Sequence, residues 1–76
     1  MERVKNWQEL EPGMYYREDS GRVWKYVEPR NSELFTFVDE DASYYDVETG
    51  EYEPYVETSY FTKNEVTHLY HTHVRG

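Results

Sequence analysis

The chain has 76 residues, enough for one domain (residues 1–76) and too few for a second. It has no cysteine, which excludes disulfides and thiolate metal sites and favours a reducing compartment. No apolar run approaches the roughly 20 residues of a membrane span, and the first residues lack a signal-peptide pattern, so we expect a cytoplasmic protein without membrane contact.

Charge and aromatic content are both high. The formal net charge is −8, and 18% of the residues are aromatic, nine of them tyrosine. High charge favours disorder, but disordered chains are poor in aromatic residues. A tyrosine ring can be buried while its hydroxyl stays in water, which suits a small domain. We therefore expect a folded chain.

The negative charge is concentrated in the middle of the chain. Residues 31–62 contain no Lys or Arg and nine of the sixteen acids, a net charge of −9. The remaining residues hold eight basic residues and seven acids, a net charge of +1. Because clustered like charges lower the stability of the compact state, we expect either a solvated surface or a countercharge supplied by a partner.

The N-terminal segment predicts a short helix. Val4, Trp7 and Leu10 are spaced three residues apart, which is the apolar stripe of a helix over residues 2–10. Pro12-Gly13 would end this helix. A lead-in strand is the alternative.

A hairpin is predicted next. Residues 14–17 and 22–27 have the composition of two strands, and 19–21 (Asp-Ser-Gly) that of the turn between them. The alternation in the second strand places Trp24 and Tyr26 on one face.

Another strand is predicted after a loop. Residues 28–33 contain Pro29 and Asn31 and predict the loop. Residues 34–38 are aromatic and β-branched, which is typical of a strand. Asp39-Glu40-Asp41 then predicts a turn or a loop tip.

A second hairpin is predicted from residues 43–47 and 51–56, with Glu48-Thr49-Gly50 between them. A two-residue type I′ turn would need Thr49 at positive φ, which a β-branched residue resists. We therefore predict a three-residue loop in which Gly50 is the left-handed bulge residue.

The two turns predict different registers. The type I′ register places four acids on one face with like charges opposed: Asp46, Glu48, Glu51 and Glu53. The bulge register places Val47 opposite Glu51 and distributes the acids over both faces, and it is the one we favour.

The C-terminal part predicts a strand, a helical turn and a last strand. Residues 59–61 continue extended, and Thr62-Lys63-Asn64-Glu65 is a capping-box pattern. Residues 67–74 predict the last strand, with Leu69 and Tyr70 on opposite faces.

Five or six short strands in a chain of this size predict a mostly β fold, either a single curled antiparallel sheet or a small SH3-like or OB-like barrel, with one short N-terminal helix. Leu10-Glu11-Pro12-Gly13-Met14-Tyr15-Tyr16, followed by Gly21-Arg22-Val23-Trp24-Lys25-Tyr26-Val27, resembles the opening hairpin of small SH3-like barrels. The resemblance covers under a quarter of the chain and implies no groove residues.

The sequence offers little for metal binding or catalysis. On a strand, His71 and His73 would share a face and His68 would point the other way, which is a weak zinc pattern, so we expect no metal and no cofactor. Asp39-Glu40-Asp41 with Asp46 lacks the spacing of an EF-hand. Nucleophile elbows, phosphate loops and HExxH motifs are absent, so we expect no enzyme.

Direct binding to nucleic acid is the weaker interpretation of the basic residues. Four of them alternate with aromatic residues that could stack on bases: Arg17, Arg22, Lys25 and Arg30 with Tyr16, Trp24 and Tyr26. The net charge of −8 opposes phosphate contacts, so we expect no direct nucleic-acid contact.

In size, charge and lack of cysteine, the chain resembles small acidic phage-encoded inhibitors of host proteins, such as nucleic-acid mimics, anti-CRISPR proteins and polymerase-binding factors. The resemblance is one of class, without a shared motif, and implies an inhibitor or modulator in the host cytoplasm that docks on a basic, nucleic-acid-binding surface of a target protein. The alternative is a structural or assembly protein that forms a homo-oligomer or part of a larger complex. The expected partner contacts are acids and the tyrosines among them: Asp39, Glu40, Asp41, Tyr44, Tyr45, Asp46, Glu48, Glu51, Tyr52, Glu53, Tyr55 and Glu57.

Overall fold

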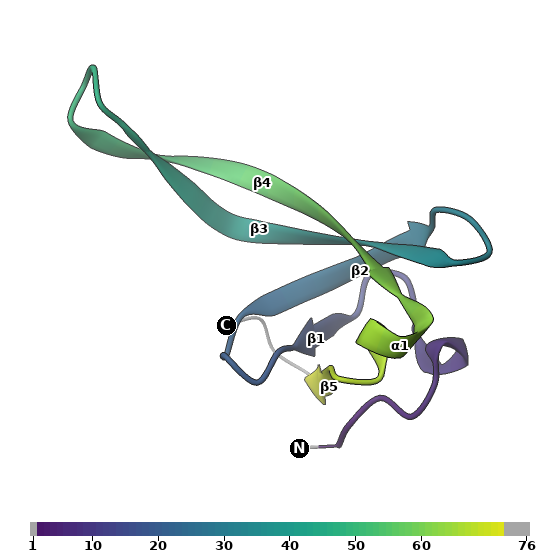
Figure 1. Ribbon diagram of the computed structural model, residues 1–76. Helices are drawn as coiled ribbons and strands as arrows, with labels where there is room; N and C mark the ends of the chain where they lie inside the picture. The colour runs from purple at the N-terminus through teal and green to yellow at the C-terminus, as the bar shows by residue number, and fades with distance from the viewer. Residues whose placement is uncertain (1, 73–76) are drawn as a thin grey trace.

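A five-stranded antiparallel sheet organises the chain, with strand order β4-β3-β2-β1-β5 (Figure 1). This is seen in a computed structural model that describes residues 2–72. The elements are η1 (Trp7–Glu9), β1 (Tyr15–Arg17), β2 (Val23–Pro29), β3 (Leu34–Asp46), β4 (Glu51–Thr62), α1 (Lys63–Val66) and β5 (Tyr70–Thr72). The prediction of a mostly β, antiparallel fold is confirmed. The sheet is open, so of the two predicted architectures the curled sheet is observed and the barrel is not.

The first hairpin forms as the sequence predicts. β1 and β2 pair with Tyr16 opposite Trp24, and Gly21 takes a positive φ of 96° in the turn. Tyr16, Trp24 and Tyr26 are all buried, whereas Lys25 between the last two is on the other face. The alternation of buried and exposed residues in β2 thus follows the period of two.

One face of the sheet carries an aromatic core. Phe37 is fully buried, and its ring lies 4.8 Å from the ring of Phe61 and 5.2 Å from that of Tyr26. Tyr16 meets Phe37 edge-on at 6.1 Å. The core is completed by Val4, Trp24, Phe35, Val66 and Leu69, with Leu10 packed against it.

A helical turn and the N-terminal segment cover this face. In α1, the Thr62 hydroxyl accepts a hydrogen bond from the Glu65 N–H, and the Glu65 carboxylate accepts one from the Thr62 N–H, so the predicted capping box is confirmed. The predicted helix over residues 2–10 is only the 3₁₀ turn η1, because the Val4 N–H donates to Leu69 and ties this stretch to the other end of the chain.

The ends of three strands differ from the prediction. β2 runs through Pro29, two residues into the predicted loop. The last strand begins at Tyr70, later than predicted, and residues 73 and 74 of that prediction lie outside the described residues. Asp39-Glu40-Asp41 was predicted as a turn and is instead part of β3, which continues for 13 residues with an irregularity between Asp39 and Ala42.

Candidate functional site

The distal halves of β3 and β4 leave the sheet together. β2 pairs with β3 only as far as Lys25 opposite Val38, whereas β3 and β4 stay paired to Asp46 opposite Glu51. Residues 39–57 therefore form a two-stranded hairpin that projects from the body of the molecule, and we call it the arm (Figure 1). All twelve residues predicted to contact a partner lie on the arm.

The tip of the arm is a four-residue loop. The Gly50 N–H donates to the Asp46 carbonyl (2.8 Å), and the Asp46 side chain accepts from the Glu48 N–H (2.9 Å). Gly50 has a positive φ of 73°, as predicted for a left-handed residue. The predicted three-residue loop is wrong, since Val47 belongs to the loop with 82% of its surface exposed and Glu51 lies opposite Asp46.

This register separates the side chains of the arm by charge. Residues directly opposite one another share a face, and the face alternates along each strand. One face, which continues the core face of the sheet, holds Asp39, Ala42, Tyr44, Asp46, Glu51, Glu53, Tyr55 and Glu57, and we call it the acidic face. The other has Glu40 at its root and beyond it holds only uncharged residues: Ser43, Tyr45, Tyr52, Pro54 and Val56. We call these five residues the neutral face. The prediction that the acids are distributed over both faces is wrong for Asp46, Glu51 and Glu53, which all lie on the acidic face.

Each face of the arm has its own tyrosine pair. Tyr44 and Tyr55 meet edge-on at 5.8 Å between ring centroids on the acidic face, and Tyr45 and Tyr52 do so at 5.2 Å on the neutral face. Such pairs add to the stability of a two-stranded ribbon. The rings remain accessible, with Tyr52 at 72% exposure.

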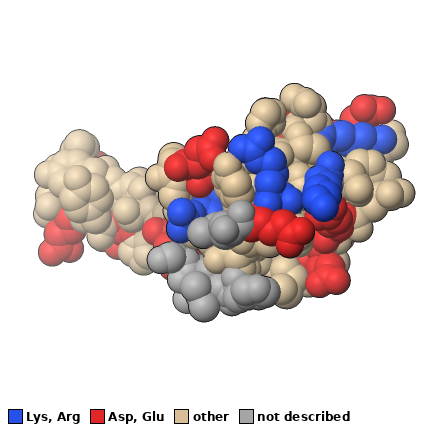
Figure 2. All heavy atoms as spheres, turned by 90° about the horizontal axis from the view of Figure 1, so that it is seen from below, with Lys and Arg blue, Asp and Glu red and all other residues tan. Residues whose placement is uncertain are grey.

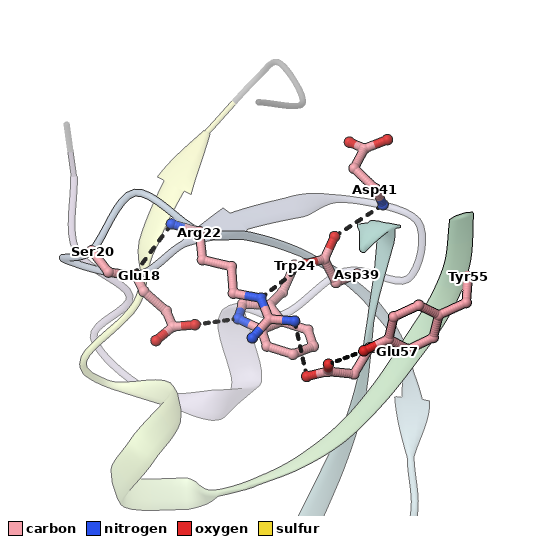
Figure 3. A network of polar contacts seen from close by, with 8 residues as sticks. All are labelled: Glu18, Ser20, Arg22, Trp24, Asp39, Asp41, Tyr55 and Glu57. Atoms are coloured by element: carbon pink, nitrogen blue, oxygen red, sulfur yellow. Dashed lines mark hydrogen bonds and ion pairs between the residues drawn. The ribbon is translucent and has the colours of Figure 1, made fainter. Parts of the chain in front are cut away.

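An arginine of the body holds the root of the acidic face (Figure 3). Arg22, just before β2, places Nε 2.8 Å from Asp39 Oδ2 and Nη2 2.8 Å from Glu57 Oε2, and its guanidinium lies 4.4 Å from the centre of the Trp24 ring. The hydrogen bond to Asp39 is the largest cause that raises the pKa of Arg22. Tyr55 donates to Glu57 (2.7 Å), which raises the pKa of Tyr55.

A second contact holds the root on the opposite side. Glu40 accepts a hydrogen bond from the Tyr15 hydroxyl (3.2 Å) and lies 3.6 Å from Lys25 Nζ. Three predicted contact residues, Asp39, Glu40 and Glu57, are thus partnered by the body. At the root of the arm, the countercharge therefore comes from Arg22 and Lys25 of the same chain, which lie outside the acidic segment.

The acids beyond the root are different. Among residues 2–72, no Lys, Arg or His forms an ion pair with Asp46, Glu48, Glu51 or Glu53. In the view of Figure 2, the basic side chains gather over the body, and the end of the arm shows acidic and uncharged residues. The arm therefore presents carboxylates, with Tyr44 among them, at a distance from the positive charges of residues 2–72.

Sequence reasoning missed the residues that position this site. Arg22 and Lys25 lie outside the acidic segment. The sequence hinted at their role only in that all basic residues lie on the two sides of that segment. It also missed the neutral face, although a signal existed: in residues 51–57, acids and Tyr55 alternate with Tyr52, Pro54 and Val56 at the period of a strand.

The histidines do not form a metal cluster in the part of the chain that the structure describes, where no three His, Asp or Glu residues are arranged to hold an ion. His71 Nε2 lies 3.0 Å from Glu9 Oε1, and this hydrogen bond lowers the pKa of Glu9. His73, part of the weak zinc pattern, lies outside the described residues. Within residues 2–72, no helix has the length and apolar character needed to cross a membrane.

One pocket of about 420 Å³ lies on the core side, lined by Glu18, Asp19, Ser20, Phe61, Glu65, His68 and Leu69. Two of its carboxylates already have structural partners: Glu18 accepts from the Trp24 indole N–H, and Glu65 belongs to the capping box. The pocket is therefore a weaker candidate for a site than the arm.

Comparison of the chain with protein-family models, curated proteins and solved structures found no match. The geometry and charge of the arm are accordingly the basis for assigning a function.

Proposed function

We propose that this protein is a small acidic modulator that docks the acidic face of its arm on a basic surface of a target protein, one that normally binds nucleic acid. The observation behind this proposal is the set of distal acids without ion-pair partners among the described residues. On one face of a strand, side chains recur every ~6.6 Å, so Glu51 and Glu53 offer a short row of negative charges to Lys and Arg.

The energetics of the arm favour a partner. Like charges directly opposite one another in a sheet are destabilising, and Asp46 and Glu51 are such a pair. A two-stranded hairpin is also marginally stable when no further layer covers it. Basic residues of a target would remove the repulsion and cover the exposed ring of Tyr44, a residue type enriched at binding hot spots.

The expected mode of action is competition. An arm that occupies the basic groove of a target keeps nucleic acid from the same Lys and Arg residues. Opposite charges also accelerate association, and salt weakens it. The chain itself contributes no catalytic step in this proposal.

Affinity capture tests the proposal. The chain is immobilised, exposed to bacterial lysate at low and at high salt, and the bound proteins are identified by mass spectrometry. We expect a nucleic-acid-binding protein at low salt that is lost at high salt. The variant Asp46→Lys/Glu48→Lys/Glu51→Lys/Glu53→Lys should not capture it. Capture that survives this reversal would show that the acids serve solubility alone.

A further inference from the structure

The sheet of the body has a second face, opposite the aromatic core, which we call the outer face. Three cross-strand pairs define it: Tyr15 with Lys25, Arg17 with Tyr70, and Thr36 with Tyr60. None of these six residues is buried. The N-terminal segment and α1 cover the core face, so the outer face is the side of the sheet that residues 2–72 leave accessible to a ligand.

Arginines and tyrosines lie together on the outer face. Nη2 of Arg3 donates a hydrogen bond to the Tyr70 hydroxyl (2.7 Å), and the Arg3 guanidinium lies 5.0 Å from the centre of the Tyr70 ring. Arg17 is the cross-strand neighbour of Tyr70 on its other side. At the far end of the face, the guanidinium of Arg30 lies 4.5 Å from the centre of the Tyr60 ring.

The positive charge of this face is only partly compensated. Within residues 2–72, no carboxylate forms an ion pair with Arg3, Arg17 or Arg30. Nε of Arg17 is buried and has no hydrogen-bond partner there. Two acids share the face, Glu28 and Glu40, and Glu40 is engaged at the root of the arm. An anionic ligand would therefore supply a countercharge that the fold does not provide.

The net charge of −8 opposes an anionic ligand, but the fold places all of this excess on the arm. Residues 39–57 hold eight acids and no Lys or Arg, whereas the rest of the chain holds eight acids and eight Lys or Arg. Along β3, Asp46 is about 26 Å beyond Val38, where pairing with β2 ends, at ~3.3 Å per residue. Since the Debye length is about 8 Å at physiological salt, the distal acids have little effect on the outer face.

We propose that the outer face binds single-stranded nucleic acid. Phosphates lie beside Arg3, Arg17 and Arg30, and unpaired bases stack on the ring of Tyr60 and on the guanidinium planes. The tyrosines favour this ligand over an acidic peptide, which has no bases to stack. The face extends from β5 to β4 over about 19 Å, at ~4.8 Å between neighbouring strands, which is room for a few nucleotides.

This surface is distinct from the arm and from the aromatic residues that the sequence suggested for base stacking. Tyr16, Trp24 and Tyr26 are buried in the core and cannot stack on a base. The acidic face of the arm continues the core face, so it points to the opposite side from the outer face. The inference does not rest on the proposed function, because a strand can bind the outer face without any protein target.

Fluorescence anisotropy of the purified full chain tests the proposal. The probes are fluorescein-labelled oligo-dT and oligo-rU of about 20 nucleotides and a DNA duplex of the same length. Unlabelled oligo-dT and a poly-Glu peptide serve as competitors. The variants Arg17→Gln and Arg30→Gln each remove one charge from the outer face, and Lys63→Gln removes one from α1 on the core side, where Lys63 lies over Trp7. Circular dichroism checks that each variant keeps the fold.

We expect both single strands to bind at least roughly tenfold more tightly than the duplex. Arg17→Gln and Arg30→Gln should each weaken binding roughly fivefold and reduce the slope of log affinity against log salt by about 0.7. Lys63→Gln should leave the affinity within about twofold and the slope unchanged.

Four results would each overturn the proposal. They are the absence of binding to either single strand, a duplex bound as tightly as the strands, and an effect of Lys63→Gln equal to that of Arg30→Gln. The fourth is displacement of the probe by poly-Glu as effectively, charge for charge, as by unlabelled oligo-dT, which would identify an acidic peptide as the ligand. Since Arg30 is exposed, its variant keeps the test decisive even where Arg17→Gln fails to fold.

Discussion

Asp46 and Glu51 lie directly opposite each other at the end of the β3–β4 ladder, so two carboxylates occupy one cross-strand pair. No Lys, Arg or His among residues 2–72 forms an ion pair with either of them. In an isolated chain this arrangement costs stability. It is therefore the local feature that most clearly points to a countercharge from outside the molecule.

Glu51→Gln should stabilise the isolated chain. The substitution removes the repulsion with Asp46 and keeps the size of the side chain, so we expect the free energy of unfolding to rise by a few tenths of a kcal/mol. Urea denaturation at low salt measures the change. The gain should shrink at high salt, and Glu28→Gln, at an exposed position of β2, should show no such gain.

Arg22→Met should loosen the root of the arm. It leaves Asp39 and Glu57, which lie opposite each other, without their shared cation and removes the guanidinium from the Trp24 ring. We expect a loss of roughly 1–2 kcal/mol, since Arg22 is partly exposed and its ion pairs are screened. Urea denaturation followed by Trp fluorescence reports the loss.

The control for that variant is Arg30→Met. Arg30 lies 4.5 Å over the ring of Tyr60, and no carboxylate of the described residues forms an ion pair with it. Its loss should cost less than 1 kcal/mol. Equal costs for the two variants would mean that the root contacts with Asp39 and Glu57 add nothing.

Phe37→Ala should unfold most of the population. Phe37 is fully buried and contacts the rings of Tyr16, Tyr26 and Phe61, so the substitution opens a cavity at the centre of the core. The expected cost of about 3–5 kcal/mol is comparable to the whole stability of a small domain. Circular dichroism measures the folded fraction. Tyr60→Ala, at a 43% exposed position, should remain folded.

The contact between Glu9 and His71 predicts a dependence on pH. Its hydrogen bond lowers the pKa of Glu9 below the ordinary value of 4.5. A carboxyl with a depressed pKa contributes stability above its ordinary pKa, and this contribution is lost as the pH falls through the folded value. Wild type should therefore be more stable than Glu9→Gln at pH 6, and the difference should shrink as the pH falls below 4.5 and through the lowered pKa of Glu9 in the folded chain. Urea denaturation across this range tests the prediction, which a constant difference would contradict.

The sequence predicted the parts of the fold that depend on local patterns. The turn before Arg22, the shared face of Trp24 and Tyr26 and the capping box at Thr62 each follow from residues close together in the chain. The prediction of a turn at Asp39-Glu40-Asp41 was wrong because this segment is held by residues that are distant in the sequence. Arg22, 17 residues away, and Tyr15, 25 residues from Glu40, allow these acids to lie in a strand.

The register of the arm depended on one loop residue. Treating Val47 as a strand residue gave a three-residue loop and a mixed distribution of acids. In the structure the Asp46 side chain accepts from the Glu48 N–H, which draws Val47 into the loop. The preference of Asp for such turns was the available local signal. A shift of one residue changes which side chains share a face, so the separation into acidic and neutral faces could not be read from the favoured register.

The measurement that tests the central claim most directly compares two variants of equal charge. Asp46→Asn/Glu51→Gln/Glu53→Gln removes three acids of the acidic face, and Asp19→Asn/Glu28→Gln/Glu33→Gln removes three exposed acids of the body, so both change the net charge from −8 to −5. Each is immobilised and exposed to bacterial lysate at low salt beside the wild type. We predict that the body variant captures the same nucleic-acid-binding protein as the wild type and that the arm variant does not. Equal capture by the two variants would contradict the claim that the arm is the docking site.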